Sequence, residues 1–247
     1  MANPIDIVWH KQISKVLTYG KDVAPRGQNT KELVNQVFEV NMKYPVLICP
    51  QRKLSYKFMA AEALWILSGD NKVETIAPYN KNIKKFSDDG IIFQGAYGPR
   101  IVSQLDYVIS TLKNDRETRQ AVLTIWNPNP KPSKDIPCTI SITFQIRDNK
   151  LDCFVFMRSS DLFLGIPYDV FTFSMLSHLV CSELDNVTPR TLYLTAASSH
   201  LYETDHERSI DCLKYDYESS SAVPKFTKAE LFNSLQDIRT TGEGWWL

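Results

Sequence analysis

Apolar and polar residues follow two different periods along this chain. Helical spacing of apolar residues predicts four helices, over residues 5–17, 55–67, 101–112 and 170–184. Alternating or continuous apolar runs predict six strands, over residues 33–41, 44–49, 121–126, 140–146, 151–157 and 191–194. Helices interleaved with strands in this way predict an α+β protein, layered as α/β proteins are, with one main sheet.

Polar, glycine-rich and proline-rich segments separate these elements. Residues 21–30 and the proline-rich residues 127–138 are predicted to be loops, and Tyr97-Gly98-Pro99-Arg100 a turn. The lysine-rich segment that ends near Gly90 is predicted to lie at the surface and to be helical in part. The last residues, 240–247, carry two tryptophans and are interpreted as a flap or a docked tail.

One connecting segment, residues 157–169, concentrates chemical groups. It places a cation, two hydroxyls and two acids around the turn Gly165-Ile166-Pro167, between a predicted strand and a predicted helix. Loops held between buried elements often carry binding or catalytic residues. The alternative is a polar connection with a surface ion pair, which the segment alone does not exclude.

Two further residues are candidates for chemistry. Glu62 interrupts a helix that is apolar on most faces, so it is either an acid paired with an arginine or a general base whose pKa burial raises. Cys138 follows Pro137 where a strand begins, and such a cysteine can be held toward a cleft. A lone cysteine is usually a small buried apolar residue, but a thiolate near arginines is a strong nucleophile.

Arg26 and the pair His200 and Tyr202 complete the candidates. Gly27 beside Arg26 lets the backbone approach whatever the guanidinium binds, although a solvated loop arginine is the simpler interpretation. His200 and Tyr202 alternate as strand residues do and can point into the same cleft. The alternative is a core histidine that a backbone carbonyl satisfies.

Composition narrows the function class. The 247 residues are 43% hydrophobic, and 28 Lys and Arg balance 28 Asp and Glu, so no global basic field attracts nucleic acid. Anion recognition must come from a few placed arginines, which favours a small ligand. Five widely spaced cysteines predict neither disulfides nor a metal site, and the start of the chain lacks a secretory signal, so we expect one cytoplasmic domain over residues 1–247 with no membrane span.

Taken in order, these pieces resemble the thymidylate synthase family. The resemblance covers residues 13–202 and rests on the order and spacing of its motifs. These motifs are Arg26-Gly27, Tyr44-Pro45-Val46-Leu47, Glu62-Ala63-Leu64-Trp65-Ile66-Leu67-Ser68-Gly69-Asp70, Tyr97-Gly98, Thr118-Arg119, Pro137-Cys138, Arg158-Ser159-x-Asp161-x-x-Leu164-Gly165-x-Pro167 and His200-x-Tyr202.

The resemblance implies a large mixed sheet flanked by helices, with one sheet face forming a homodimer interface. It also implies a pyrimidine nucleoside 5′-monophosphate as substrate, 5,10-methylenetetrahydrofolate as co-substrate, and carbon transfer to C5 through a covalent adduct of Cys138 with C6 of the base. No metal is implied.

The same resemblance assigns roles by position. Cys138, Glu62, Asp169 and Tyr97 fall at catalytic positions, Glu62 as the acid that manages protons and water. Arg26, Arg158 and Ser159 match phosphate ligands, Arg119 matches an arginine that reaches the partner subunit's phosphate, and His200 and Tyr202 match residues near the sugar 3′-hydroxyl. Asp161, Leu164, Gly165 and Tyr168 fall where the family meets folate.

Several departures from the family pattern bear on the substrate. Asp169 stands where thymidylate synthases have Asn, and a carboxyl that shares one proton with N3 and accepts from the N4 amino group suits cytosine. Cys138-Thr139 replaces Cys-His, and both changes are similar to those of bacteriophage deoxycytidylate hydroxymethylases. Ile83, Lys84 and Phe86 replace a tryptophan cluster, and Gln120 replaces a second arginine.

These departures predict that the chain transfers the one-carbon unit to dCMP and adds water, which gives 5-hydroxymethyl-dCMP and tetrahydrofolate. Three alternatives stay open: a thymidylate synthase that methylates dUMP, an enzyme that hydroxymethylates the ribonucleotide CMP, and a nucleotide-binding paralogue without turnover.

Overall fold

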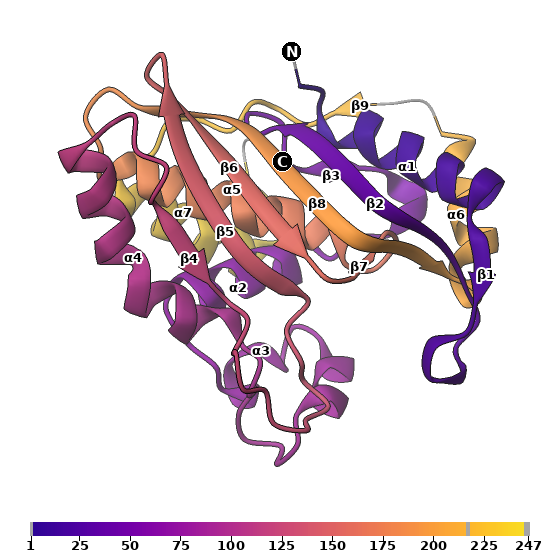
Figure 1. Cartoon of the computed structure of the whole chain (residues 1–247). Coiled ribbons are helices and arrows are strands. Elements are labelled where there is room, and N and C mark those ends of the chain that lie inside the picture. The colour runs from indigo at the N-terminus through magenta and orange to yellow at the C-terminus, as the bar shows by residue number, and fades with distance from the viewer. Residues whose placement is uncertain (1, 216–217, 245–247) are drawn as a thin grey trace.

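A seven-stranded sheet forms the centre of the molecule (Figure 1). The computed structural model describes residues 2–215 and 218–244. The sheet strands are β1 (Lys21–Val23), β2 (Thr30–Asn41), β4 (Val122–Thr124), β5 (Thr139–Arg147), β6 (Lys150–Met157), β7 (Ser160–Asp161) and β8 (Thr188–Tyr202). Their order is β1-β2-β8-β6-β5-β4, with β7 beside β8. Strand β8 runs parallel to β6 and β7 and the other pairs are antiparallel, so the predicted mixed sheet is confirmed.

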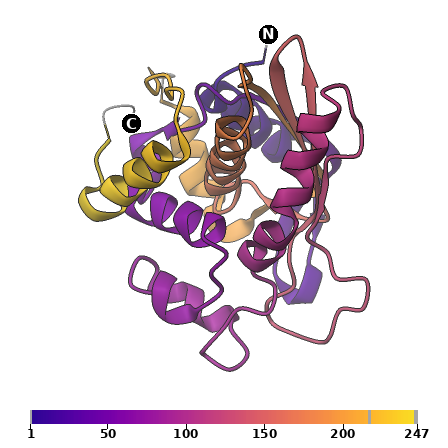
Figure 2. The same cartoon turned by 90° about the vertical axis from the view of Figure 1, so that its left-hand side faces the viewer.

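Helices cover one face of this sheet, which Figure 2 shows from the side. The α-helices are α1 (Ile5–Tyr19), α2 (Tyr56–Leu67), α3 (Val73–Ile76), α4 (Tyr97–Asn114), α5 (Ile166–Ser182), α6 (His206–Leu213) and α7 (Lys228–Thr241). Short 3-10 helices are η1 (Pro25–Gly27), η2 (Pro50–Arg52), η3 (Lys81–Phe86) and η4 (Glu203–Asp205), and β3 (Leu47–Ile48) pairs with β9 (Glu218–Ser219). None of the helices in the described part of the chain has both the length and the apolar character of a membrane span.

The core lies between the sheet and α5. Helix α5 packs on β6 and β8, with α2 and α7 behind it, so most of its side chains are buried. Buried apolar residues from α1 through α7 form one continuous cluster with those of the sheet. Local signals agree with this packing, because Ser55 caps α2 by accepting from Phe58 N at 3.2 Å and Thr227 forms a capping box with Glu230 on α7.

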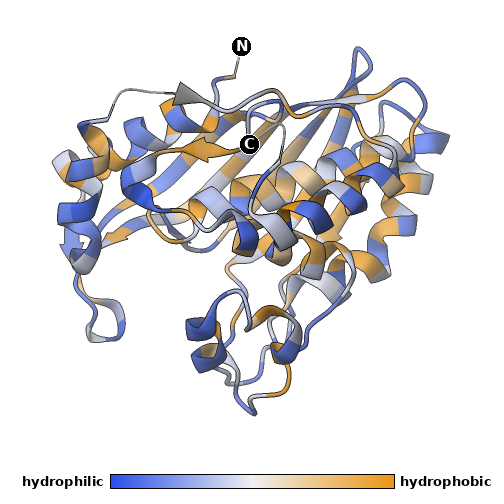
Figure 3. Ribbon diagram, turned by 180° about the vertical axis from the view of Figure 1, so that it is seen from behind, coloured by the Kyte–Doolittle hydropathy of each residue, from blue (hydrophilic) through white to orange (hydrophobic). Residues whose placement is uncertain are grey.

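The opposite face of the sheet is open to the viewer in Figure 1, whereas the helices are in front in Figure 3. Buried residues alternate with exposed ones along its strands, as the pleat requires. Val34, Val37 and Phe156 are 68%, 47% and 51% exposed there, and Phe154 stacks on Tyr193 with ring centroids 5.0 Å apart. One chain therefore leaves an apolar sheet face uncovered.

Sequence periodicity placed several boundaries wrongly. Tyr97–Arg100 is not a turn but the first turn of α4, where Pro99 is tolerated because its missing N–H would have no helical partner. Helix α5 begins at Ile166 rather than at residue 170, with Pro167 in its first turn, so Asp169 lies on the helix. Residues 21–30 are not simply a loop, since they contain β1 and η1.

Two strand predictions also had wrong lengths. Only Leu47–Ile48 of the predicted strand 44–49 is a strand, while the short strand predicted at 191–194 is part of the 15-residue β8. Ala196-Ala197-Ser198-Ser199 has low strand propensity, but pairing with β2 on one side and with β6 and β7 on the other keeps it extended. Of the predicted C-terminal flap, residues 245–247 lie outside the described residues.

A smaller unit, residues 71–96, projects beyond the lower end of the sheet in Figure 1 and is called the small lobe below. It contains α3 and η3, as the prediction of partial helix in this segment expected. The proline-rich loop, residues 127–138, runs beside it between β4 and β5.

Candidate active site

Five predicted residues meet where the sheet ends nearest the small lobe. Cys138 directly precedes β5, Arg158 directly follows β6, and Tyr97 is the first residue of α4. Asp169 lies in the first turn of α5, and Glu62 lies in the middle of α2. All five are partly exposed and act on one another through their charges, and we infer from this that they line a recess.

The Cys138 thiol lies against the Arg158 guanidinium. Arg158 Nη2 is 3.7 Å from Cys138 Sγ, and its Nε and Nη2 donate to the carbonyls of Pro137 and Ile136 at 3.0 and 2.9 Å. The backbone N–H of Arg158 also donates to Cys138 O at 2.8 Å. Burial raises the pKa of the thiol, and the charges of Arg158 and Arg26 oppose that rise.

The Tyr97 hydroxyl contacts the residue next to Cys138. It accepts a hydrogen bond from Thr139 N at 3.2 Å, and its ring stacks on Phe173 with centroids 6.4 Å apart. Burial raises the pKa of the phenol well above its ordinary value, and the charges of Asp169 and Cys138 raise it further. Tyr97 therefore stays protonated and can donate its own hydrogen into the site.

Two acids share the site. Burial raises the pKa of Asp169 to about 7, and the charge of Asp161 adds to the rise. Burial raises the pKa of Glu62 to about 8, with a further contribution from Asp169. Both side chains can therefore hold a proton near neutral pH, which ordinary surface carboxylates cannot.

The segment between β7 and α5 holds Asp169 in place. Asp161 Oδ1 accepts from the backbone N–H groups of Phe163 and Leu164 at 2.8 and 2.9 Å, which fixes the turn. A Cβ on Gly165 would lie 3.0 Å from Asp161 O and 3.3 Å from Asp169 Oδ2. Glycine therefore lets the Asp169 carboxyl pack against the turn, while the Leu164 side chain is 48% exposed at the rim.

Strand β8 contributes His200 and Tyr202, as the alternation predicted. Their rings meet edge to face with centroids 5.2 Å apart. Asp161 of β7 pairs with His200 in the sheet register. Burial lowers the pKa of His200, and the charge of Asp161 opposes this shift.

The predicted phosphate-binding residues differ in their exposure and in their distance from Cys138. Arg158 and Ser159 are partly buried beside Cys138, whereas Arg26 is exposed on η1 with a left-handed φ of 53°. Arg119 is exposed in the connection after α4, whose 18 residues separate it from Tyr97 by about 27 Å of helix. Within one chain, Arg119 is therefore not brought to the site, and neither is the neighbouring exposed Gln120.

The residues predicted to contact folate lie between β7 and the first turn of α5. Tyr168 accepts from Ser55 N at 3.3 Å, and its ring packs edge to face on Phe58 at 5.0 Å. Sequence reasoning missed Arg52, which is only 4% exposed and donates from Nε to Phe163 O at 2.7 Å. Its guanidinium lies 4.5 Å from the Phe163 ring and supports the turn before α5. The segment Pro50-Gln51-Arg52-Lys53 gave no signal for this, because it looks like a solvated charged loop.

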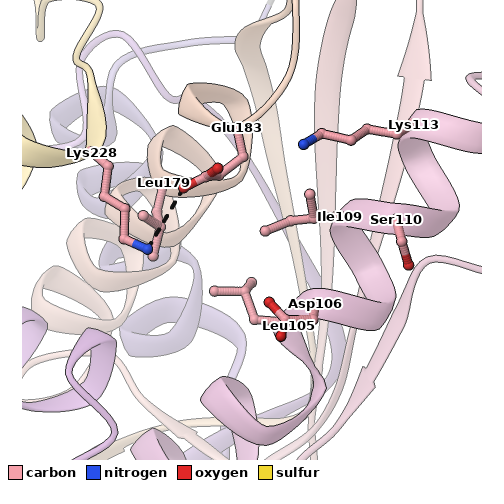
Figure 4. Close-up of a pocket in the computed structure, with 8 residues that line it drawn as sticks. All are labelled: Leu105, Asp106, Ile109, Ser110, Lys113, Leu179, Glu183 and Lys228. Carbon is pink, nitrogen blue, oxygen red and sulfur yellow. Dashed lines mark ion pairs between the residues drawn. The ribbon is translucent and has the colours of Figure 1, made fainter.

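Two other cavities lie away from these residues. One of about 270 Å³ lies between α4, α5 and the start of α7, where Lys228 and Glu183 form an ion pair at 3.6 Å (Figure 4). Another, of about 350 Å³, lies under the β1–β2 connection and includes Asn29 and Glu203. Neither is lined by the predicted catalytic groups.

Candidate metal sites and disulfides were sought among the described residues. No group of three or more His, Cys, Asp and Glu side chains there could hold a metal ion, and the five cysteines are free. Cys138 is partly exposed, whereas the other four cysteines are buried.

Comparison with known proteins assigns the family. The family model described as thymidylate synthase matches residues 8–240. The chain belongs to the thymidylate synthase family. Its members transfer a one-carbon unit to a pyrimidine nucleotide, with methylenetetrahydrofolate as co-substrate.

Individual relatives differ in their names. A deoxyuridylate hydroxymethyltransferase of Bacillus phage SP01 is 33% identical over 221 residues, which are 80% of this chain and 57% of the relative. A deoxyuridylate hydroxymethyltransferase of Pseudomonas phage M6 is 38% identical over 129 residues, 49% of this chain and 37% of the relative. A thymidylate synthase of Staphylococcus haemolyticus is 23% identical across 96% of this chain and 93% of its own length.

The chain thus spans little more than half of the first phage relative and about a third of the second. The expected resemblance to phage hydroxymethylases holds at the level of the reaction named, but both relatives are named for deoxyuridylate and not for deoxycytidylate.

Proposed function

We propose that this protein transfers a one-carbon unit from 5,10-methylenetetrahydrofolate to C5 of dCMP and adds water, giving 5-hydroxymethyl-dCMP and tetrahydrofolate. The observation that carries the choice of base is Asp169, a carboxyl with a pKa raised to about 7 beside the nucleophile. The names of the phage relatives support hydroxymethylation as the type of reaction.

Cys138 is the proposed nucleophile. Its thiolate adds to C6 of the base, which removes the aromaticity of the ring and leaves C5 as a nucleophilic enamine carbon. C5 then bonds the one-carbon unit, which is still attached to a folate nitrogen, and loses its hydrogen as a proton. The bond between that carbon and the folate nitrogen breaks, so tetrahydrofolate leaves and an exocyclic methylene remains on C5. A hydroxide from water adds to this methylene, and the thiolate leaves C6 as the C5–C6 double bond re-forms. The Arg158 guanidinium beside Sγ favours the thiolate that starts and ends this sequence.

The base is read by Asp169. Cytosine presents an N4 amino donor and an N3 acceptor, and a carboxyl that carries one proton can accept from N4 while it shares that proton with N3. N3 of cytosine is a much stronger base than O4 of uracil, so the shared proton makes the stronger bond with cytosine. The raised pKa of Asp169 keeps that proton available near pH 7.

Glu62 and Tyr97 are the proposed proton-transfer groups. Glu62, with its pKa raised to about 8, can exchange protons with the base and with water at neutral pH. Tyr97 remains a phenol and donates its hydrogen toward the acceptor that develops in the recess.

Substrate and co-substrate binding are distributed around the recess. Arg26, Arg158 and Ser159 are the proposed phosphate ligands, and His200 and Tyr202 lie in the strand that would face the sugar. Methylenetetrahydrofolate supplies the one-carbon unit. The fit to it rests on Leu164, an apolar side chain 48% exposed next to buried neighbours, with Asp161, Gly165 and Tyr168 close by in the same segment.

We also propose a twofold homodimer formed through the open sheet face. Val34, Val37 and Phe156 expose apolar surface there, which a second copy could bury. Arg119 would then serve the phosphate site of the partner, which accounts for its distance from Cys138 within one chain. Sedimentation at micromolar concentration should give a dimer, and a monomer at that concentration would contradict the proposal.

A second candidate is hydroxymethylation of dUMP, which the names of both phage relatives favour. A neutral carboxyl can also donate to uracil O4 and accept from its N3–H, although both bonds are then between neutral groups. A thymidylate synthase that methylates dUMP differs from the proposal in base and product, and an enzyme that acts on CMP differs in the sugar, so the same assay separates them.

The test is a competition among dCMP, dUMP and CMP with methylenetetrahydrofolate, with products identified by mass spectrometry. We expect 5-hydroxymethyl-dCMP and no dihydrofolate absorbance. The KM for dCMP should rise as pH increases through about 7, because Asp169 then loses the shared proton. Asp169→Asn should remove this pH dependence and shift preference toward dUMP by about tenfold or more. Thymidylate with dihydrofolate, or exclusive use of dUMP by the unchanged protein, would overturn the proposal.

A further inference from the structure

The proline-rich loop that delivers Cys138 is fastened to the small lobe by two aspartates. Asp88 of the small lobe accepts from Ser133 Oγ at 2.5 Å and from Lys134 N at 2.9 Å. Ser133 Oγ in turn accepts from Asp135 N at 3.0 Å. The loop is thus folded around one carboxylate of a segment that lies forty residues or more earlier in the chain.

Asp135 makes the complementary contact from the loop side. Its Oδ2 accepts from Gly95 N at 2.6 Å. The two backbones also touch, since a Cβ on Gly95 would lie 2.4 Å from Asp135 O. No other residue type fits at position 95 without moving the loop, so the contact fixes where residue 135 lies.

The other end of the loop is tied to the same lobe. Arg100 donates from Nη2 to Gln94 O at 2.8 Å and from Nη1 to Ile125 O, the carbonyl just before the loop. One arginine on α4 therefore bridges the small lobe and the end of β4.

The small lobe is itself fixed to the helix that carries Glu62. Phe93 packs edge to face on Trp65 with centroids 5.6 Å apart, and Trp65 lies one helical turn from Glu62. Within the lobe, Phe93 N donates to Asn71 O at 2.8 Å and Val73 N to Ile91 O at 2.8 Å. The lobe is thus a bonded link between the helix of one acid and the loop of the nucleophile.

We propose that Asp135 is a positioning residue for Cys138, and that the bond from Gly95 to Asp135 sets the place of the nucleophile relative to Glu62. This inference rests on the proposed function for the identity of the reaction, whereas the contacts of Asp135 do not depend on that function. Only Ile136 and Pro137 separate Asp135 from Cys138, and Pro137 restricts the backbone there, so a displacement at residue 135 passes to the thiol. A shift of about 1 Å in a reacting group can lower a rate by about a hundredfold.

Asp135 also acts on the thiol through its charge, and this allows contact and charge to be separated. The charged and titratable groups that act on Cys138 are Arg158, Asp169, Arg26, Asp135 and Tyr97. The charge of Asp135 raises the pKa of the thiol. Asp135→Asn keeps an oxygen to accept from Gly95 N–H but removes the charge, whereas Asp135→Ala removes both.

The experiment measures alkylation of Cys138 by iodoacetamide as a function of pH, with peptide mass spectrometry to locate the label, together with kcat and KM for the nucleotide. Asp135→Asn should move the alkylation profile to lower pH and keep kcat within about threefold of the unchanged protein. Asp135→Ala should lower kcat about tenfold or more, with a smaller change in KM, because the thiol is no longer held in place.

Controls separate this result from misfolding and from a wrong function. Asp237→Ala changes an exposed aspartate on α7 and should leave alkylation and kcat unchanged. Asp88→Ala, which releases the loop from the side of the small lobe, should lower kcat as Asp135→Ala does. The proposal is overturned if Asp135→Asn loses as much kcat as Asp135→Ala, or if Asp135→Ala matches Asp237→Ala in alkylation. Absence of turnover in the unchanged protein would count against the proposed function, while the alkylation contrast would still test Asp135.

Discussion

The acids and the arginines of this site are held in different ways. Glu62 and Asp169 lie on α2 and α5, inside the packed part of the molecule, where burial shifts their pKa values upward. Arg26 and Arg119 lie on exposed connections, and the structure of one chain does not bring Arg119 to the site. The proposed proton-transfer groups are thus fixed by the fold, while two of the proposed phosphate ligands, Arg26 and Arg119, lie at its edges.

This difference has a physical reason. A buried carboxyl is destabilised in its charged form, so it can be kept there only by surrounding packing that the whole fold supports. An arginine stays charged in any environment and gains from an exposed position, where it can close on a dianionic phosphate after diffusion brings the nucleotide near.

The largest loss of activity should come from changing Cys138, which the fold holds in place. Cys138→Ala should lower release of tritium from [5-³H]dCMP by about 10⁴-fold or more, since the covalent route is lost. Cys181→Ala, at a buried cysteine on α5, is the control and should keep most of the activity. Tritium release that survives Cys138→Ala would show that Cys138 is not the nucleophile.

Glu62→Gln should lower kcat by about 10²- to 10⁴-fold and yet stabilise the fold at high pH. Because the folded pKa of about 8 lies above the usual carboxylate value, wild-type stability falls as pH rises between these two values. At about 1.4 kcal/mol per pKa unit, a rise from 4.5 to about 8 gives the variant a gain of at most about 4 kcal/mol between pH 5 and pH 9.

Urea unfolding at both pH values measures this gain. Glu74→Gln, at an exposed glutamate on α3, provides the baseline. If Glu62→Gln is no more stable to urea than the unchanged protein at pH 9, the charged form of Glu62 does not destabilise the fold.

The smallest loss of activity is expected from changing Arg119, which lies on an exposed connection. Arg119→Ala should weaken nucleotide binding by about ten- to a hundredfold, which is the usual loss for one hydrogen-bonded charge. Mixing it with Cys138→Ala should restore about a quarter of wild-type activity, because half of the randomly paired dimers then hold one complete site. Arg116→Ala, in the same connection, should bind as the unchanged protein does, and failure of the mixture to recover activity would place Arg119 outside the partner's site.

Sequence reasoning recovered the parts of this molecule that depend on local pattern. The helix with Glu62 in it, and the alternation of His200 and Tyr202, were predicted because the pattern of apolar and polar residues acts over a few residues. The start of α5 was missed because Gly165-Ile166-Pro167 looks like a turn, while Pro167 in fact occupies a first-turn position.

What the sequence could not reveal are contacts between distant segments. Asp135 looked like one more polar residue in a proline-rich loop, and its bond to Gly95 depends on how the small lobe folds back. Arg52 likewise gave no signal, because only the folded chain places Phe163 against it. Asp169 was singled out by residue type, but its raised pKa needs the surrounding packing of α5.

The pairing of β2 with β8 has a consequence for how the protein matures. It joins Lys31 to Leu201, so during synthesis β2 waits for nearly the whole chain before its partner emerges from the ribosome. Until then its edge is unpaired and can associate with other extended chains. The recess between β8, β6 and α5 therefore forms late, and a truncated or stalled chain should be prone to aggregate before it can bind any nucleotide.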